Sequence, residues 1–519
     1  MCTGSPSTAD LIGTLMTGWA GPHSGMAREL VLRWGRHLGA TVDIPEESDS
    51  CCFVTHLTDV YLGGLDSPPC LLIYDDERAA TGLRDLLQRA TRENRLAIVL
   101  AVSKRSPDIT RQALPPDRVV VLDAAALVEI MESPEPLAIL KQHVRSQIPR
   151  RRLIPFQILL PVSGSMFFGR SEILDQLLYR PQASFAIAGP GGIGKSSILA
   201  QYRHLLQRQR DPRIHRLVSI SLKGVQAGLN DAPVRHVAMA LNPSSRTYYE
   251  TTAKDLTRIL QQQSARLGGP LDLLIDEVDE VCQTGLFATL GEAAKQGHCR
   301  LVLCGRGVLL RLMLSPNSAL AQRVQLLRPE PLPAEIARDL VLKPLGDLGF
   351  RVTSEDEVLA GILQLTGRLP HLLQFFLGKV ANCCIDNKTE VISPEDVDTV
   401  TWDFESARFF TAPLREIQQK ECARLALLLI EEMESGASIP EICRLAARHG
   451  LQLSEWEAFE MCSDLLINNV LAWSHGACFR IANGALVSYA SRLGLVSGGK
   501  PAPESAAGSA AHRHGSPTK

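Results

Sequence analysis

Gly189-Pro190-Gly191-Gly192-Ile193-Gly194-Lys195-Ser196 matches the pattern G-x-x-x-x-G-K-[ST] at every fixed position. An apolar run typical of a buried strand, Ala183–Ala188, precedes it, and Ser197–Tyr202 follows with the pattern of a helix. The glycines let successive backbone N–H groups point at a polyphosphate, at a helix N-terminus that already favours anions. The stretch therefore predicts a phosphate-binding loop.

The loop residues carry distinct expected roles. We expect Lys195 to contact the β- and γ-phosphates and Ser196 to bind Mg²⁺, so the expected cofactors are ATP or ADP with Mg²⁺. A glycine-rich turn without a ligand is the alternative, which a second motif downstream makes weaker. The expected nucleotide-binding residues of this stretch are Gly189, Pro190, Gly191, Gly192, Ile193, Gly194, Lys195, Ser196 and Ser197.

The second motif, Leu271–Glu277, is an apolar strand that ends in two carboxylates. An acid at this strand end can hold the Mg²⁺ shell together with Ser196, and a second acid can take a proton from the attacking water. We assign Asp276 to the metal and Glu277 to the general base. By itself such a strand is a weak signal, but downstream of a complete phosphate loop it becomes strong.

Polar residues also follow a third apolar strand, Arg300–Cys304, which ends in Gly305-Arg306. A polar group there is expected near the γ-phosphate, so Arg306 is a candidate sensor and joins Glu277 and Lys195 as a candidate catalytic residue. The alternative is an arginine that pairs with a surface acid. The acids that continue the second motif, Asp279 and Glu280, are interpreted as the start of the next helix.

Composition limits the class of protein. A length of 519 residues predicts three or four domains, and 45% apolar with 21% charged residues is ordinary for globular proteins. The net charge of −2 argues only mildly against wholesale nucleic-acid binding, because a neutral total can hide a local basic face. Thirteen cysteines without a C-x-x-C spacing predict buried thiols in a reducing cytosol rather than disulfides or zinc ligands. Apolar runs such as Leu96–Val102 are too short to span a membrane, so we expect a cytoplasmic protein without a membrane partner.

Residues 1–155 predict a small α/β domain. Helical patterns at Thr8–Thr17, His23–Leu38 and Thr81–Asn94 alternate with short apolar runs, which predicts a mostly parallel sheet. The acids Asp75, Asp76 and Glu77 follow one strand and are interpreted as a helix cap, with a ligand site as the alternative. No D/E-x-K element precedes residue 150, so a lysine-dependent nuclease is disfavoured and the activity of this domain stays unassigned. The expected strands are Cys51–Thr55, Cys70–Tyr74, Leu96–Val102 and Val119–Leu122.

The segment Ile148–Pro155 is rich in proline and arginine and predicts a stiff, exposed connector. Its arginines, Arg150, Arg151 and Arg152, are interpreted as solvated, with contact to an acidic partner or a phosphate as the alternative.

The rest of the chain divides by its patterns. Residues 156–325 form the predicted nucleotide-binding core, and residues 326–405 are wholly helical and predict a lid. Residues 406–494 have helix, helix, helix and hairpin patterns typical of a winged helix, and residues 495–519 are predicted to be disordered. The expected lid helices are Pro333–Leu348, Glu355–Leu365, Pro370–Cys384 and Pro394–Trp402, and those of the winged helix are Arg415–Glu432, Pro440–His449 and Glu455–Asn468.

In this order the elements from Phe167 to about Leu493 resemble the STAND class of signal-transducing P-loop ATPases, relatives of the AAA+ and origin-recognition ATPases. The resemblance rests on Phe168–Glu172, which is like the class motif h-h-G-R-x-E, on Gly367–Pro370 in the lid, and on the loop, strand ends and winged helix described above. It implies an α/β multidomain fold with a P-loop core, a helical lid, a C-terminal winged helix and a small N-terminal α/β domain. It adds Arg170, Arg368 and Pro370 to the nucleotide-binding residues, with Pro370 against the adenine.

The resemblance implies a slowly hydrolysing ATPase switch that forms a homo-oligomer in its ATP state and acts on an unknown protein partner. Phe479–Asn483 stands where some members carry Met-His-Asp, so this chain lacks the wing histidine of those members. The alternative is a DNA-binding ATPase of the origin-recognition type. The region Pro413–Gly494 holds seven Lys and Arg against ten Asp and Glu, which disfavours DNA as a partner.

Overall fold

The fold is known from a computed structural model that divides into two compact units, each of which is described by itself. The first unit comprises Met1–Ala188, Gly192–Leu363 and Arg368–Thr401, and the second comprises Gly189–Gly191, Gln364–Gly367 and Trp402–Lys519. The structure describes residues 8–17, 23–44, 52–65, 68–73, 95–102, 117–209, 211–225, 232–242, 252–281, 285–314, 323–415, 419–433, 436–474 and 478–492, and the single positions 83, 86, 88, 90, 92, 318, 320 and 417.

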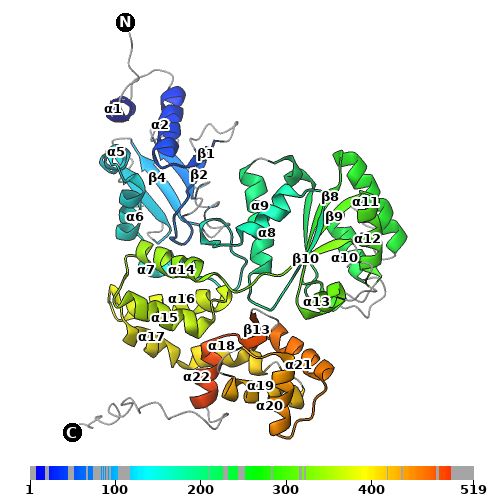
Figure 1. Cartoon of the computed structure of the whole chain (residues 1–519). Coiled ribbons are helices and arrows are strands. Elements are labelled where there is room, and N and C mark those ends of the chain that lie inside the picture. The colour runs from blue at the N-terminus through cyan, green and yellow to red at the C-terminus, as the bar shows by residue number, and fades with distance from the viewer. Residues whose placement is uncertain are drawn as a thin grey trace, which may run out of the picture. The chain divides into compact units, whose positions relative to one another are not determined.

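The N-terminal part holds a five-stranded sheet in the order β1-β2-β3-β4-β5 (Figure 1). Strands β3, β4 and β5 are parallel, as predicted, but β2 pairs in an antiparallel manner with both of its neighbours, β1 and β3. The prediction of a mostly parallel sheet is therefore wrong for this edge. Residues 57–65, between β2 and β3, contain no helix, whereas a parallel pair needs a long crossover. The strands are β1 (Thr41–Asp43), β2 (Cys52–His56), β3 (Pro69–Ile73), β4 (Ala97–Ala101) and β5 (Val119–Asp123).

Helices α1 (Thr8–Thr17) and α2 (His23–His37) stand where the sequence predicts helices. Of the helix expected over Thr81–Asn94, the described positions are helical, and Leu83, Leu86 and Ala90 pack on the sheet. The acids Asp75, Asp76 and Glu77 lie outside the described residues. Two further helices, α5 (Ala124–Glu132) and α6 (Pro136–Gln147), complete this part.

The predicted exposed connector is instead a packed helical turn, α7 (Arg150–Leu153). Ile148 and Leu153 are buried at its two ends. Each arginine of the turn pairs with an acid: Arg150 with Glu390, Arg151 with Asp386 and Arg152 with Asp117. Arg151 and Arg152 are exposed, as the solvated interpretation expects, and the pairing of all three with acids also bears out the alternative of an acidic partner, here within the same chain.

The central sheet has the order β10-β6-β9-β8-β7, with every pairing parallel. Helices α8 and α9 pack on one face and α10, α11 and α12 on the other, so the sheet is covered on both sides (Figure 1). Three central strands are apolar along almost their whole length, as expected of a sheet buried on both faces. The strands are β6 (Ser184–Ala188), β7 (Leu217–Ser221), β8 (Leu271–Asp276), β9 (Cys299–Gly305) and β10 (Val324–Leu327). The helices are α8 (Ser171–Tyr179), α9 (Lys195–Arg208), α10 (Ala232–Leu241), α11 (Ala253–Leu267), α12 (Leu286–Lys295) and α13 (Gly307–Leu314).

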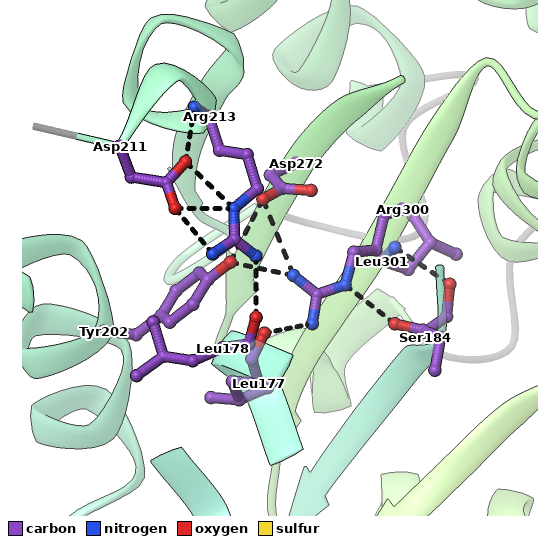
Figure 2. A network of polar contacts seen from close by, with 10 residues as sticks. Leu177, Leu178, Ser184, Tyr202, Asp211, Arg213, Asp272, Arg300 and Leu301 are labelled. Carbon is purple, nitrogen blue, oxygen red and sulfur yellow. Dashed lines mark hydrogen bonds and ion pairs between the residues drawn. The ribbon is translucent and has the colours of Figure 1, made fainter. Parts of the chain in front are cut away.

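A buried ion pair lies near the N-terminal ends of β8 and β9 (Figure 2). Arg300 and Asp272 are 2% and 4% exposed, and an Arg300 nitrogen lies 3.5 Å from a carboxylate oxygen of Asp272. Arg300 also donates to the Tyr202 hydroxyl (2.8 Å), which in turn donates to Asp272 (3.1 Å). Further hydrogen bonds join Arg300 to the carbonyls of Leu177 and Ala183. Burial raises the pKa of Asp272, although the Arg300 charge opposes that shift.

The lid of the first unit contains the helices that the sequence predicts, with boundaries shifted by one or two residues. A short parallel pair that the sequence did not reveal, β11 (Arg351–Val352) with β12 (Val391–Ile392), ties two of its loops together. The helices are α14 (Ala334–Asp347), α15 (Glu355–Thr366), α16 (Pro370–Asp386) and α17 (Pro394–Thr401).

The second unit contains five helices and an antiparallel hairpin among its described residues. The helix predicted over Arg415–Glu432 begins later, as α19 (Lys420–Glu432), and a separate helix that was not predicted, α18 (Phe404–Arg415), precedes it. Capping boxes begin two of these helices, at Ser438 with Glu441 and at Ser454 with Glu457. The winged-helix interpretation stays a prediction, and the predicted disordered tail lies outside the described residues. The other elements are α20 (Ile439–Arg448), α21 (Glu455–Ile467), β13 (Leu471–Ser474), β14 (Cys478–Ile481) and α22 (Gly484–Arg492).

The described residues contain neither a membrane-spanning helix nor a cluster of metal ligands. No helix among them is long and apolar enough to cross a membrane. Over the same residues, no group of three or more His, Cys, Asp or Glu side chains gathers as metal ligands would. The described cysteines are free thiols, and most are buried, as the sequence predicts.

We predict that Arg300→Leu destabilises the fold by about 3–5 kcal/mol, because it leaves the Asp272 carboxylate buried without its counter-charge. Urea unfolding of the full chain measures this change. The control Arg258→Leu breaks an exposed pair with Asp255 and should cost less than about 1 kcal/mol. Adding Asp272→Asn to Arg300→Leu should restore part of the loss. Equal stability of Arg300→Leu and Arg258→Leu would show that the buried pair is no more important for stability than the exposed one.

Candidate nucleotide site

The candidate site lies where three parallel strands of the central sheet end side by side. Ala188, the last residue of β6, pairs with Gly305, the last residue of β9. On the other side of β9, Ile275 of β8 pairs with Leu303. The carboxyl ends of parallel strands meet at one edge of a sheet, which is the usual place for ligands in such folds. The sequence-predicted residues that follow these strands are therefore brought to a common edge.

Lys195 begins helix α9, directly after the glycine-rich loop. Gly192 and Gly194 have φ values of 72° and 97°, a region that favours glycine, so the loop needs these residues to turn into the helix. The Lys195 side chain is 9% exposed, and burial lowers the pKa of its ammonium group to about 8. Arg306 lowers this pKa further, while Asp276 and Asp279 raise it. The candidate lysine, sensor and metal ligand are thus close enough to act on one another.

The hydroxyl residues after Lys195 differ in their surroundings. Ser196 is partly buried in the first turn of α9, as a metal ligand at the loop requires. The Ser197 hydroxyl accepts a hydrogen bond from the Val162 backbone (3.0 Å), and Gln201 accepts one from the Gly164 backbone (2.7 Å). Ser197 therefore helps to fix the segment before α8 against α9.

Arg170 contacts the loop itself. Its guanidinium donates to the backbone carbonyl of Ile193 (3.3 Å), and burial lowers the pKa of this group to about 10. The residue has a positive φ of 65° where it caps helix α8. Arg170 thus supports the backbone of the phosphate loop, a contact that the motif alone did not specify.

The predicted acids stand at the end of β8. Asp276 is its last residue and is partly buried. The carboxylate of Asp276 accepts a hydrogen bond from the backbone of Glu277 (2.8 Å), and Glu277 has a positive φ of 55°. Such a conformation is uncommon for residues other than glycine and often marks a functional site. Two successive carboxylates therefore stand at the end of a single strand, as the sequence predicts.

Two residues at this edge were missed by sequence reasoning. Asp279, interpreted as the start of a helix, accepts hydrogen bonds from the start of α13, including one from the Arg306 backbone (2.5 Å). His371, which follows Pro370 in the lid, donates from its backbone to the carbonyl of Gly192 (3.2 Å). Both contacts join segments that are distant in sequence. No pattern in the residues around Asp279 or His371 predicts that these residues make such contacts.

The lid meets the loop at its two positive-φ glycines. A Cβ placed on Gly192 would lie 2.8 Å from the Cβ of His371, and one on Gly194 would lie 4.0 Å from the ring of Pro370. Burial lowers the pKa of the His371 imidazole, which keeps it neutral near pH 7. Arg368, also predicted to bind nucleotide, is half-buried with a φ of 61°, and its carbonyl accepts a hydrogen bond from the Leu332 backbone (3.0 Å).

Residues 153–489 match the family described as novel STAND NTPase 1 (nSTAND1), a region that covers well over half of the chain. The chain belongs to this family. It is therefore a P-loop NTPase of the STAND type, as the resemblance implied. No match was found among curated proteins.

Solved structures with a similar fold include three P-loop proteins. A Walker-type ATPase of Pyrococcus abyssi has 14% identity and a TM-score of 0.49, covering 64% of this chain and 99% of that one. The Orc1 protein of Aeropyrum pernix in complex with DNA has 16% identity and a TM-score of 0.38, covering 64% and 92%. The Holliday junction branch migration motor RuvB of Thermotoga maritima has 17% identity and a TM-score of 0.35, covering 63% and 96%. All three scores are below 0.5, so the family assignment rests on the family match.

We predict that nucleotide affinity falls as the pH rises above 8. Burial lowers the pKa of Lys195 to about 8, and a bound polyphosphate would raise that pKa. Binding is thus strongest below pH 8 and weakens by up to about tenfold per pH unit above it. Titrations of ADP by calorimetry between pH 7.5 and 9.5 measure this slope. Lys195→Arg should remove the slope, because arginine keeps its charge throughout. A pH-independent affinity in the unaltered protein would refute the assignment.

Proposed function

We propose that the protein is a regulatory ATPase switch that binds ATP with Mg²⁺, hydrolyses it slowly, and changes conformation or oligomeric state with ADP/ATP exchange. The observation that carries this proposal is the contact of His371 with Gly192 (3.2 Å). Because the lid contacts the phosphate loop, phosphates that bind more tightly to one arrangement of lid and loop would shift the protein toward that arrangement.

The residues at the strand ends suit a magnesium nucleotide. A Ser196 hydroxyl and an Asp276 carboxylate are the oxygen ligands that Mg²⁺ prefers. The loop N–H groups and Lys195 suit a polyphosphate, and Mg²⁺ would neutralise charge that develops on its oxygens. Glu277 would take a proton from water as the water oxygen bonds to the γ-phosphorus and the bridging bond breaks, which leaves ADP and phosphate. Arg306 would contact the γ-phosphate that ADP lacks.

The lid also connects to the N-terminal domain within the first unit. Asp347, at the end of α14, pairs with Lys141 (2.8 Å), and both side chains are largely buried. The same carboxylate accepts a hydrogen bond from the Tyr61 backbone (2.8 Å), and the Tyr61 ring stacks on Phe168 (5.4 Å between centroids). Phe168 stands two residues before Arg170, which contacts the loop. We therefore propose that the N-terminal domain senses or transmits the nucleotide state, with a homo-oligomer in the ATP state and a protein partner that is unknown.

The second candidate is a DNA-binding ATPase of the origin-recognition type. Its support is the helix and hairpin pattern of the second unit. Against it, the exposed positions of α21 include Glu455, Trp456, Glu457 and Glu460, and this helix carries no Lys or Arg. Acidic side chains on the helix that would enter a groove repel phosphates. We therefore favour protein contacts as the output.

Lys195→Ala and Glu277→Gln should have opposite effects on the assembly of the protein in the presence of ATP. Losing the lysine charge should weaken nucleotide binding by about 2–4 kcal/mol, so the protein stays at its resting mass. Glu277→Gln keeps its shape but cannot accept the proton, so ATP binds while hydrolysis slows by roughly 10²–10⁴-fold. That variant should accumulate in a larger ATP-bound assembly. Native mass and ATP turnover measure both effects.

The control for this pair is Glu280→Gln, which changes an exposed acid in the same turn. It should leave both turnover and native mass unchanged. Normal hydrolysis by Glu277→Gln would show that another group is the base.

The chain of residues 1–519 should not bind duplex DNA through ionic contacts. Fluorescence anisotropy with a labelled duplex at 50 mM salt should show no saturable binding, with or without ATP. Tight binding at low salt that weakens steeply as salt rises would instead favour the origin-recognition type.

A further inference from the structure

The Asp279 carboxylate caps the start of helix α13. One of its oxygens accepts from the Arg306 backbone (2.5 Å), and the other accepts from Val308 (3.0 Å) and Leu309 (3.2 Å). The first N–H groups of a helix have no partner within the helix, and a carboxylate there also favours the helix dipole. This cap comes from a different segment, the short 3-10 helix η3 (Val278–Val281) that follows β8.

The junction between these two segments is tightly packed. A Cβ added to Gly305 would lie 2.9 Å from the Asp279 carboxylate, 2.9 Å from the Val278 side chain and 2.7 Å from the Leu309 side chain. Val278 and Val281 are fully buried on either side of Asp279. The segment after β8 therefore has little freedom to shift relative to the segment after β9.

Both segments carry a candidate functional group next to this junction. Glu277 precedes the turn in its positive-φ conformation, which costs of order 1–3 kcal/mol and persists only where the surroundings impose it. Arg306 is held by its own backbone N–H on Asp279, while its side chain is exposed. Arg306 is thus anchored to the Asp279 carboxylate through its backbone, and Glu277 lies two residues before Asp279 in the same packed segment.

We infer that Asp279 is a positioning residue that sets Glu277 and Arg306 relative to each other, so that ATP hydrolysis depends on a group that does not touch the nucleotide. This inference rests on the proposed ATPase function. A displacement of about 1 Å at a reacting group can cost up to 10²-fold in rate. Loss of the Asp279 cap frees two such groups at once, while Lys195 and the loop backbone that bind ADP keep their places.

The test is a double-mutant cycle on ATP hydrolysis by the full chain. Asp279→Ala should lower kcat on the order of 10–100-fold, with the Kd for ADP changed by less than roughly threefold. Arg306→Ala should lower kcat as well. Because Asp279 acts in part through Arg306, the double variant should lose much less than the product of the two single losses. Asp279→Asn, which keeps one acceptor oxygen, should recover part of the rate.

The matched control is Thr252→Ala, which removes a side-chain cap from helix α11 in the same domain. It should lower the melting temperature as Asp279→Ala does, yet leave kcat unchanged. If Asp279→Ala keeps the normal rate, or if its effect multiplies with that of Arg306→Ala, Asp279 is only a structural cap and the inference fails. If the unaltered protein hydrolyses no ATP, the proposed function fails, and the inference falls with it.

Discussion

The parallel register of β6, β9 and β8 is the constraint on which the candidate site depends. These strands bring Lys195, Asp276 and Arg306 to one edge of the sheet, although the residues are far apart in the sequence. Burial lowers the pKa of Lys195, Arg306 lowers it further, and Asp276 raises it. A register slip of one residue moves a strand by about 3.3 Å and reverses its faces. Such a slip would separate the loop from its acids.

The buried ion pair near the opposite ends of these strands bears directly on that register. Asp272 and Arg300 are register partners in β8 and β9, on the face that α8 and α9 cover (Figure 2). A slip of either strand by one residue would turn its charged side chain toward the apolar cluster of the other face. An unpaired buried charge costs several kcal/mol, far more than one misplaced apolar side chain. The ion pair therefore makes registers shifted by one residue less stable than the native register, whatever its net contribution to folding stability.

Much of the fold could be predicted because it is encoded locally. The loop, its strand and its helix are adjacent in sequence, and so are the caps at Ser438 and Ser454. The antiparallel β1–β2 edge and the packing of α7 depend on partners that are distant in sequence. The same reason explains why Asp279 and His371 were missed at the candidate site. An aspartate that caps its own helix and one that caps a helix 27 residues later look alike in a sequence.

The strength of the loop and lid contacts fits a system that a ligand can shift. A backbone hydrogen bond from His371 to Gly192, worth about 0.5–1.5 kcal/mol net, joins the lid to the loop. Moving a two-state equilibrium from 1:99 to 99:1 takes about 5.5 kcal/mol of differential binding. A few charge-assisted contacts to a γ-phosphate, at about 1.5–3 kcal/mol each, reach that range.

The attachment of the lid to the N-terminal domain is of a different kind. It uses the largely buried Lys141–Asp347 pair and several contacts around it, and removing one partner of a buried pair costs about 3–5 kcal/mol. If the proposed switch moves the lid, its backbone hydrogen bond to Gly192 should break more readily than the buried Lys141–Asp347 pair. The lid and the N-terminal domain would then move together. Such a movement would transmit the nucleotide state from the phosphate loop to the N-terminal domain, whose activity the sequence leaves unassigned.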